Sequence, residues 1–496
     1  MNAAKTSLKK RQWIWVSALA LATGALDAAD SLVWQATSGA WDNADNWLLG
    51  DGSGSPTTEA GHVPTGDDAV FFGPKWGNWT TATPTNEIAL GASAEVARLD
   101  LNKKSVSVFD LGKQTLAVKT RFIVNSGADV TLKNGIFRHL NADTSGLGKL
   151  NEVNSAILRL VGADAAWQSK TDLKFKKQSG NTALLEIAEG ASFQGGVTIE
   201  NVTTGTELAQ ATIRGEGTCV QPGKFDWDAD TQVSGGGISI SGSGSVRVDV
   251  RDGAVVDMTD AHLAVLGTTS NAVVVIDNAF FTNRHVNAVN REIKVGCQGG
   301  WNTLMVTNSA VLYTEMGINV ANDAYKNIAE GSGPSNALVV ADGGMVVLAA
   351  NRSGDVRSLK VGAGHGDARL VLDGGCIETP GSVVVGADTA ASNSVLVVRG
   401  TNSLLTATDL ELSRNAQMRC EIPQAGLVQP PVQIARYVCA RYNYNLAWYG
   451  EAPSLTLSAD AWIQKTGGKL TLLTCGVADD RGLNKKVLEQ LRDTGN

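Results

Sequence analysis

The sequence contains few of the residues on which metal, redox and nucleic-acid chemistry depend. Charged residues make up 18% of the 496 residues, against about 25% in an ordinary globular chain. The five histidines show no HxH or HExxH spacing, and the six cysteines include no CxxC pair. The formal net charge is −7, and no basic cluster follows the first residues of the chain. We therefore expect no cofactor and no nucleic-acid partner.

Proline is also scarce, and long hydrophobic runs are absent after the N-terminus. There are 11 prolines but 55 glycines, and hydrophobic residues make up 43% of the chain. That hydrophobic share excludes a disordered protein. Val, Thr, Ser, Asn and Gly are abundant, which is typical of strands joined by turns. Because the chain is longer than one ordinary core, we expect several domains or a repeat array.

The N-terminus has the pattern of an export signal. Four basic residues come first: Lys5, Lys9, Lys10 and Arg11. An apolar run from Trp13 to Leu26 follows, and small residues end the segment. We predict a cleaved signal peptide over residues 1–29 and a secreted or cell-surface protein. A membrane anchor is the alternative, but the run is shorter than the roughly 20 residues that a span needs. No later segment is apolar enough to span, so we expect no transmembrane segment after signal removal.

A short phrase recurs five times in the second half of the chain. Its first residues are Asn271, Asn302, Asn336, Asp367 and Asn393, which are 31, 34, 31 and 26 residues apart. A second column, polar or charged throughout, lies six residues later at Asp277, Asn308, Asp342, Asp373 and Arg399. The residues two and four positions after the first column are mostly apolar, as in a strand with one buried face. Small residues then predict a turn, and a second strand-like phrase of the form L-x-V-G follows.

A period of this length predicts a solenoid or a propeller. Each unit shows two clear strands, whereas a propeller blade needs four, and a coil absorbs variable lengths in outward loops. We therefore predict an all-β fold, a right-handed parallel β-helix or β-solenoid over residues 91–415, with about 11 coils. We interpret the Asn and Asp columns as hydrogen-bonded ladders at a corner of the coil rather than as metal or catalytic sites.

Both ends of the array differ from its middle. Five tryptophans fall in the first segment: Trp34, Trp41, Trp47, Trp76 and Trp79. We predict an aromatic-rich cap over residues 30–90, because a solenoid needs a cover on its first coil. A glycan-binding site made by the same tryptophans is the alternative, because aromatic rings stack on sugars. For residues 416–496 we predict a small C-terminal β cap, with strands in SLTLSADAWIQ and KLTLLTC, that ends in a short helix.

The first segment also resembles a known family. Its motifs are SGAWDNADNW within the spaced tryptophans and P-x-G-D-D-A-V-F-F, and the repeats add Gly-Ala turns and L-x-V-G endings. Together they resemble the autotransporter-passenger-like β-helix proteins of bacteria with an outer membrane, which carry autotransporter-associated β-strand repeats. The resemblance implies a secreted or surface-displayed β-helix that serves adhesion or an extracellular matrix, and it supplies no catalytic residues. The chain departs from the family after Ser413, where we find no C-terminal membrane barrel.

Two further sets of residues are candidates for sites. Asp226, Asp228 and Asp230 resemble the start of a calcium loop, but Thr231 stands where that loop needs glycine, so we expect no metal. Cys420 and Cys439 are the candidate disulfide pair that export would permit. No stretch predicts catalytic residues. The sequence thus predicts an exported, non-catalytic, adhesin-like or structural protein, with glycans or surface and matrix proteins as partners. The alternative is a polysaccharide-binding or polysaccharide-degrading β-helix, acting as a lyase or hydrolase.

Overall fold

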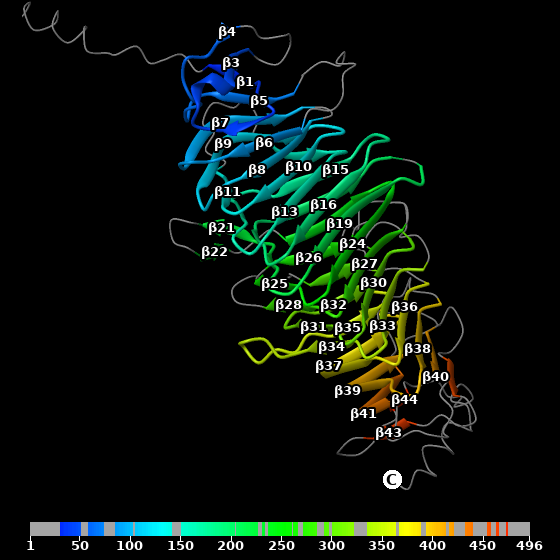
Figure 1. Cartoon of the computed structure of the whole chain (residues 1–496). Helices are drawn as coiled ribbons and strands as arrows, with labels where there is room; N and C mark the ends of the chain where they lie inside the picture. The colour runs from blue at the N-terminus through cyan, green and yellow to red at the C-terminus, as the bar shows by residue number, and fades with distance from the viewer. Residues whose placement is uncertain are drawn as a thin grey trace, which may run out of the picture.

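The computed structural model describes residues 30–474 with gaps. The gaps are 51–57, 74–84, 103–104, 141–149, 204, 227–230, 234–236, 260, 266–270, 285–291, 297–299, 322–334, 364–366, 388–392, 413–415, 421–431, 440–453, 458–462 and 466–472. The described residues form 44 strands and one 3-10 helix, η1 (Ala44–Asn46). They stack into a parallel β-helix that runs from β1 at one end to β44 at the other (Figure 1). The all-β fold predicted from the sequence is confirmed.

Each full coil contributes three strands, which form three faces of the rod. Face one is the 15-stranded sheet. Its strands are β2 (Ser38–Ala40), β6 (Thr85–Ala89), β8 (Val106–Asp110), β10 (Asp129–Lys133), β13 (Ile157–Val161), β16 (Ala183–Ala188), β19 (Leu208–Arg214), β24 (Ser245–Arg251), β27 (Ala272–Asp277), β30 (Thr303–Thr307), β33 (Ala337–Ala341), β36 (Arg369–Asp373), β38 (Val395–Arg399), β40 (Gln417–Cys420) and β42 (Ser454–Leu457).

Faces two and three together make the 27-stranded sheet. Face two contains β11 (Ile136–His139), β14 (Ala166–Ser169), β17 (Ser192–Gln194), β20 (Cys219–Gln221), β25 (Val255–Thr259), β28 (Phe280–Arg284), β31 (Val311–Thr314), β34 (Met345–Leu348) and β43 (Ile463–Lys465). Face three contains β1 (Ser31–Trp34), β5 (Ala69–Phe72), β12 (Leu150–Asn154), β15 (Leu173–Lys177), β18 (Val197–Asn201), β23 (Gly237–Gly242), β26 (His262–Val265), β29 (Ile293–Val295), β32 (Ile318–Val320), β35 (Leu359–Val361) and β44 (Leu473–Thr474). Five long strands cross from face two to face three: β7 (Ala94–Leu101), β9 (Thr115–Val124), β37 (Cys376–Val385), β39 (Leu404–Leu412) and β41 (Val432–Cys439).

The core is a column of apolar side chains inside the rod. Alternate residues of each strand point inward, so Leu304 and Val306 of β30 lie over Leu338 and Val340 of β33, and all four are fully buried. In the N-terminal half the column is aromatic, and Trp167 stacks between two phenylalanine rings. Burial of each large apolar side chain contributes about 1.5–3 kcal/mol to the free energy of folding. The same contact recurs from coil to coil, which explains why the phrase repeats in the sequence.

A turn with an unusual backbone follows ten strands of face one, from β10 to β38. In ten consecutive coils the residue directly after the strand has a positive φ: Asn134, Gly162, Glu189, Gly215, Asp252, Asn278, Asn308, Asp342, Gly374 and Gly400. Most residues avoid this left-handed conformation, whereas Gly, Asn and Asp tolerate it. Of the polar column predicted before this turn, Asn308 and Asp342 occupy the left-handed position, so backbone geometry explains their residue types. Asp277, Asp373 and Arg399 lie one residue earlier, at the ends of β27, β36 and β38.

The first predicted column is wrong in its register, because it combines two neighbouring columns. Asn271, Asp367 and Asn393 have positive φ at the corner before face one. Asn302 and Asn336 lie one position further on and are fully buried. The predicted ladders are present at two places among the described residues: the Asn302 amide donates to Asn336 Oδ1 at 3.0 Å, and the Asn308 amide donates to Asp277 Oδ1 at 2.8 Å. A slip of one residue reverses which side chains face inward. The inward residues were therefore predicted wrongly in three of the five repeats, those that begin at Asn271, Asp367 and Asn393.

Sequence patterns also missed one strand per coil. The residues after each turn, such as Met345–Leu348, form face two, whereas the predicted L-x-V-G phrase forms face three. Face two strands are short and half-exposed on their outer side, so their alternation is brief. The predicted number of coils nevertheless agrees with the 11 strands of face one that the structure describes from β8 to β38.

The two ends extend the same stack. At the N-terminus β1 pairs in parallel with β5 and antiparallel with β3 (Trp47–Leu49), which pairs with β4 (Thr58–Glu59). At the C-terminus β40 and β42 continue face one, and β43 and β44 pair with β41, so the strands predicted there are present. Residues 1–29 and the predicted terminal helix lie outside the described residues. Within the described part of the chain, no helix has the length and hydropathy to cross a membrane.

Candidate functional site

The outer side of the N-terminal half is occupied by side chains that bind one another. On face two, Arg138 donates to Gln168, and amide bonds of 3.1 Å continue the ladder through Gln194 to Gln221. On face one, Arg159 pairs with Asp129 and Glu186, and Glu186 also binds Arg214. Exposed pairs of this kind contribute little individually. They do fix the side chains of successive coils in one arrangement.

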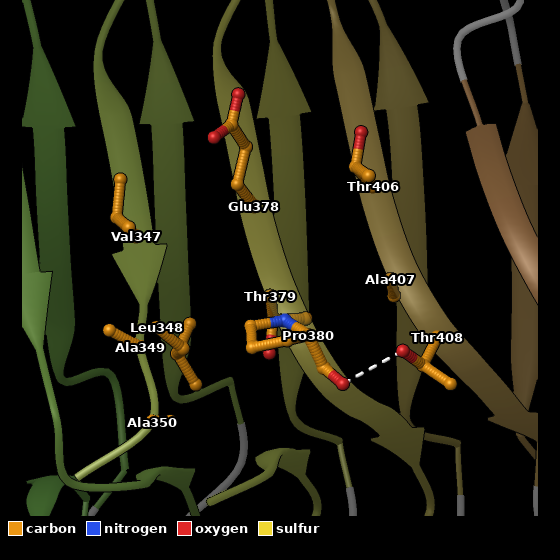
Figure 2. Close-up of a pocket in the computed structure, with 10 residues that line it drawn as sticks. All are labelled: Val347, Leu348, Ala349, Ala350, Glu378, Thr379, Pro380, Thr406, Ala407 and Thr408. Carbon is orange, nitrogen blue, oxygen red and sulfur yellow. Dashed lines mark hydrogen bonds between the residues drawn. The ribbon is translucent and has the colours of Figure 1, made fainter. Parts of the chain in front are cut away.

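A groove lies on the outer side of the rod where face two bends toward face three. Its volume is about 530 Å³. It is lined by three neighbouring strands, β34, β37 and β39, and by the residues that follow β34 (Figure 2). The lining residues are Val347, Leu348, Ala349, Ala350, Glu378, Thr379, Pro380, Thr406, Ala407 and Thr408. Because adjacent strands are about 4.8 Å apart, the groove presents the same positions of three coils side by side.

The groove combines hydroxyl groups and one carboxylate with a small apolar floor. Glu378 and Thr408 are exposed, and Thr406 is half-buried. The Thr408 hydroxyl donates to the Pro380 carbonyl at 2.7 Å (Figure 2). The Cys376 thiol lies 3.9 Å from Glu378 Oε1, and burial, with this carboxylate beside it, raises the pKa of Cys376 to about 11. Such a surface can exchange hydrogen bonds with hydroxyl-rich ligands.

A second hollow of about 340 Å³ lies near the N-terminal end of face one. Its charged lining residues are Glu87, Asp110 and Lys133, and Lys133 Nζ lies 3.4 Å from Asp110. Burial opposes ionisation of Asp110, but hydrogen bonds from Asn134 and from the Gly112 amide hold its pKa below the usual value. The Asp110 carboxylate is thus already bound by residues of its own turn and by Lys133.

The tryptophans proposed as glycan-binding residues divide into two groups. Trp34, Trp41 and Trp47 are buried at the N-terminal end, with edge-to-face contacts at centroid distances of 5.0 and 4.9 Å. The Trp47 indole donates to the Trp41 carbonyl at 2.9 Å. These rings cover the first coil and present no face to a sugar. Trp76 and Trp79 lie outside the described residues.

The acidic and cysteine candidates lie partly outside the described residues, so their pairing stays a prediction. Asp226 ends β21 (Lys224–Asp226) and pairs across a hairpin with Thr231 of β22 (Thr231–Val233), whereas Asp228 and Asp230 lie outside the described residues. No group of three His, Cys, Asp or Glu residues suited to a metal occurs among the described residues. Cys420 and Cys439 end strands of face one and face three, and their side chains lie outside the description.

One polar cluster lies inside the rod. His139 is fully buried, and its ring nitrogens face the Thr120 carbonyl at 3.4 Å and the Thr171 hydroxyl at 3.2 Å. Burial lowers the pKa of His139 to about 4, although the Thr120 carbonyl favours the charged form. The imidazole is therefore neutral at pH 7 and acts as a structural hydrogen-bonding group.

Sequence reasoning missed the groove residues, since they belong to strands that it did not assign. The one available signal was the threonine spacing in Thr406 and Thr408 after a predicted turn. Comparisons with known proteins add no further assignment: no family model, no curated protein and no solved structure matches this chain.

Proposed function

We propose that this protein is an exported, non-catalytic β-helix rod of the cell exterior, adhesin-like or structural. The observation that carries the proposal is the lateral groove, which is built from equivalent positions of three stacked coils. Backbone pairing aligns Val347 with Glu378 and Glu378 with Thr406, so one side of the groove is held by the sheet. Rigid positioning lowers the entropy cost of binding an extended partner.

The N-terminal segment supports the export part of the proposal. Residues 1–29 have the order of a signal peptide, with basic, apolar and small residues in turn. The resemblance to autotransporter passengers points in the same direction. Export would produce a chain that starts at Ala29 or Asp30. N-terminal sequencing of the protein recovered from outside intact cells tests this, and an unprocessed chain retained in the cytoplasm would contradict it.

A polysaccharide-binding role is the second candidate, and the groove chemistry favours it. Threonine hydroxyls and one carboxylate can donate to and accept from sugar hydroxyls. Glycosidases mostly use a pair of carboxylates, and the lining of this groove contains one, Glu378. We therefore propose binding here and not cleavage.

A glycan-array screen of the full chain tests the groove directly. We expect binding to a neutral or weakly charged polysaccharide, reduced about tenfold or more by Glu378→Gln combined with Thr406→Val, because two hydrogen bonds are lost. Thr131→Val on face one is the matched control, since it removes an outward hydroxyl far along the rod from the groove. Binding that survives the groove variant, or that is lost equally in the control, would contradict a glycan site here.

A further inference from the structure

The outer surface of face one changes character halfway along the rod. One column of outward residues pairs in register through five strands: Val275, Met305, Val339, Val371 and Val397. We name these five residues the apolar stripe. Toward the N-terminus the same column contains Arg159, Glu186, Thr212 and Asp249. Toward the C-terminus it continues with Arg419.

The apolar stripe lies on the side of the strands that faces away from the core. The inward side of the same strands is already filled, for example by Leu338 and Val340 of β33. Four members of the stripe are half-buried, and Val275 is 8% exposed. A sheet that is open on one side normally alternates apolar inside with polar outside. Five consecutive apolar residues on the outer side therefore indicate a contact surface.

The stripe and its flanks are arranged symmetrically about Val339. Two strands before it the column holds Val275, and two strands after it Val397; three strands away stand Asp249 and Arg419. The flank before the stripe contains, in the same order, Val273, Thr303, Ala337, Arg369 and Val395. The flank after it contains Asp277, Thr307, Ala341, Asp373 and Arg399.

We propose that the apolar stripe binds the same stripe of a second copy of this chain, with the two rods antiparallel. A two-fold axis along β33 through Val339 places each strand opposite the strand equally far on the other side of the centre. Val275 then faces Val397 of the second copy, and Val273 faces Val395. At the centre the small residues Ala337 and Ala341 face themselves, which permits close approach of the two sheets.

Charge complementarity supports the antiparallel arrangement. It places Asp277 opposite Arg399 of the second copy. Asp249 stands opposite Arg419, but Arg247 of the same chain already pairs with Asp249 at 2.8 Å, so the argument depends on Asp277 and Arg399. Arg399 is 53% exposed and donates to Asp373 in its own chain through one edge of the guanidinium, which leaves further donors for Asp277. Parallel rods would instead set Val273 against Asp277 and Val395 against Arg399, and so would bury charges against apolar side chains.

The area fits a reversible dimer. Seven strands at about 4.8 Å and strands of five residues at about 3.3 Å give roughly 550 Å² on each copy. The total of about 1,100 Å² lies at the low end of specific interfaces, where association is weak or transient. We therefore expect a dimer that forms in the micromolar range and dissociates on dilution.

Sedimentation velocity of the full chain over a range of concentrations tests the proposal. We expect a reversible dimer, weakened about 100-fold or more by Val339→Asp, because two carboxylates would then meet at the two-fold axis. Val108→Asp is the matched control, since it stands in the same outward column but outside the stripe, and it should leave the dimer unchanged. Circular dichroism verifies that both variants fold.

A charge exchange tests the orientation of the rods. Asp277→Arg and Arg399→Asp should each weaken the dimer, because each places like charges opposite one another. The double variant should restore it, since the two residues contact each other only across the antiparallel interface. The proposal would be overturned by a chain that stays monomeric at every concentration. It would also be overturned by a dimer that Val339→Asp and Val108→Asp weaken equally. Failure of the double variant to restore association would overturn the antiparallel arrangement.

Discussion

At the scale of single residues, the titratable groups of this protein serve the coil rather than a reaction. His139 lies inside the rod as a neutral imidazole, and burial lowers its pKa to about 4. The unfolded chain, with an ordinary histidine pKa, binds a proton between about pH 6.5 and 4 that the folded chain does not. As far as His139 is concerned, the folded chain therefore has its full stability above pH 6.5 and loses stability as the pH falls toward 4.

We predict that His139 makes the rod less stable in acid. Between pH 7.5 and pH 5 the free energy of unfolding should fall by about 2 kcal/mol on account of this residue. His139→Leu, which fills similar space without a titratable group, should remove that part of the pH dependence. Urea unfolding of both proteins at the two pH values measures it. An unchanged difference between the two pH values in the variant would show that other groups are responsible.

The Cys376 thiol gives a second residue-scale prediction. Burial and the neighbouring Glu378 raise its pKa to about 11, so at pH 8 the reactive thiolate is rare. Alkylation should be about 100-fold slower than for a thiol of ordinary pKa. Glu378→Gln should accelerate it by removing the adjacent negative charge. Mass spectrometry of the peptide that contains Cys376 follows the reaction, and equal rates in the two proteins would contradict the effect of the carboxylate.

At the scale of the element, the left-handed turn that follows the strands of face one from β10 to β38 is a regular feature of the fold. Asp342 has φ 47° there, and the Thr307 hydroxyl donates to its carboxylate at 3.3 Å. A β-branched residue in this left-handed conformation is strained by about 1–2 kcal/mol. The turn thus restricts which residues can follow a strand, independently of any ligand.

We predict that Asp342→Val destabilises the rod by about 1–2 kcal/mol. Asp342→Gly loses the same hydrogen bond but adopts the conformation freely, so it separates the backbone effect from the side-chain effect. Thermal or urea unfolding of the two variants gives the difference. If valine and glycine prove equally stable at this position, backbone strain does not determine the residue in the turn.

The elements also show what the sequence could and could not reveal. Val, Leu and Ile at period two, followed by Asx and Gly, identified stacked parallel strands, because each coil must place the same kind of residue over the last. The exact inward residues were not recoverable for rows such as Asp367–Asp373. There, outward Val371 is as apolar as inward Leu370 and Leu372, so periodicity alone does not distinguish the two sides. The groove was not predicted because its residues become neighbours only when three coils stack.

At the scale of the whole molecule, stability passes from coil to coil. Each coil contacts only its neighbours, so the N-terminal aromatic cluster protects the coils next to it and not the distant end. Trp47 is fully buried and contacts Trp34, Trp41 and Phe72. Removal of such a side chain costs about 3–5 kcal/mol.

We predict that Trp47→Ala loosens the N-terminal coils and leaves the C-terminal ones intact. Hydrogen exchange should become faster in β1, β3 and β5, while β30 to β37 keep their protection. Hydrogen exchange of the unaltered protein, measured in the same way, provides the reference. Loss of protection along the entire rod would instead show that the chain unfolds as one cooperative unit.

The equal registration of successive coils also has a consequence for how such a gene can change. Every coil returns to the same point of the cross-section, one strand spacing further along the rod, whether the coil contains 26 or 34 residues. If one whole coil is duplicated or deleted, the coils that then meet therefore already match in their stacking surfaces. The rod can change length in steps of about 4.8 Å while both ends and the remaining side chains keep their neighbours.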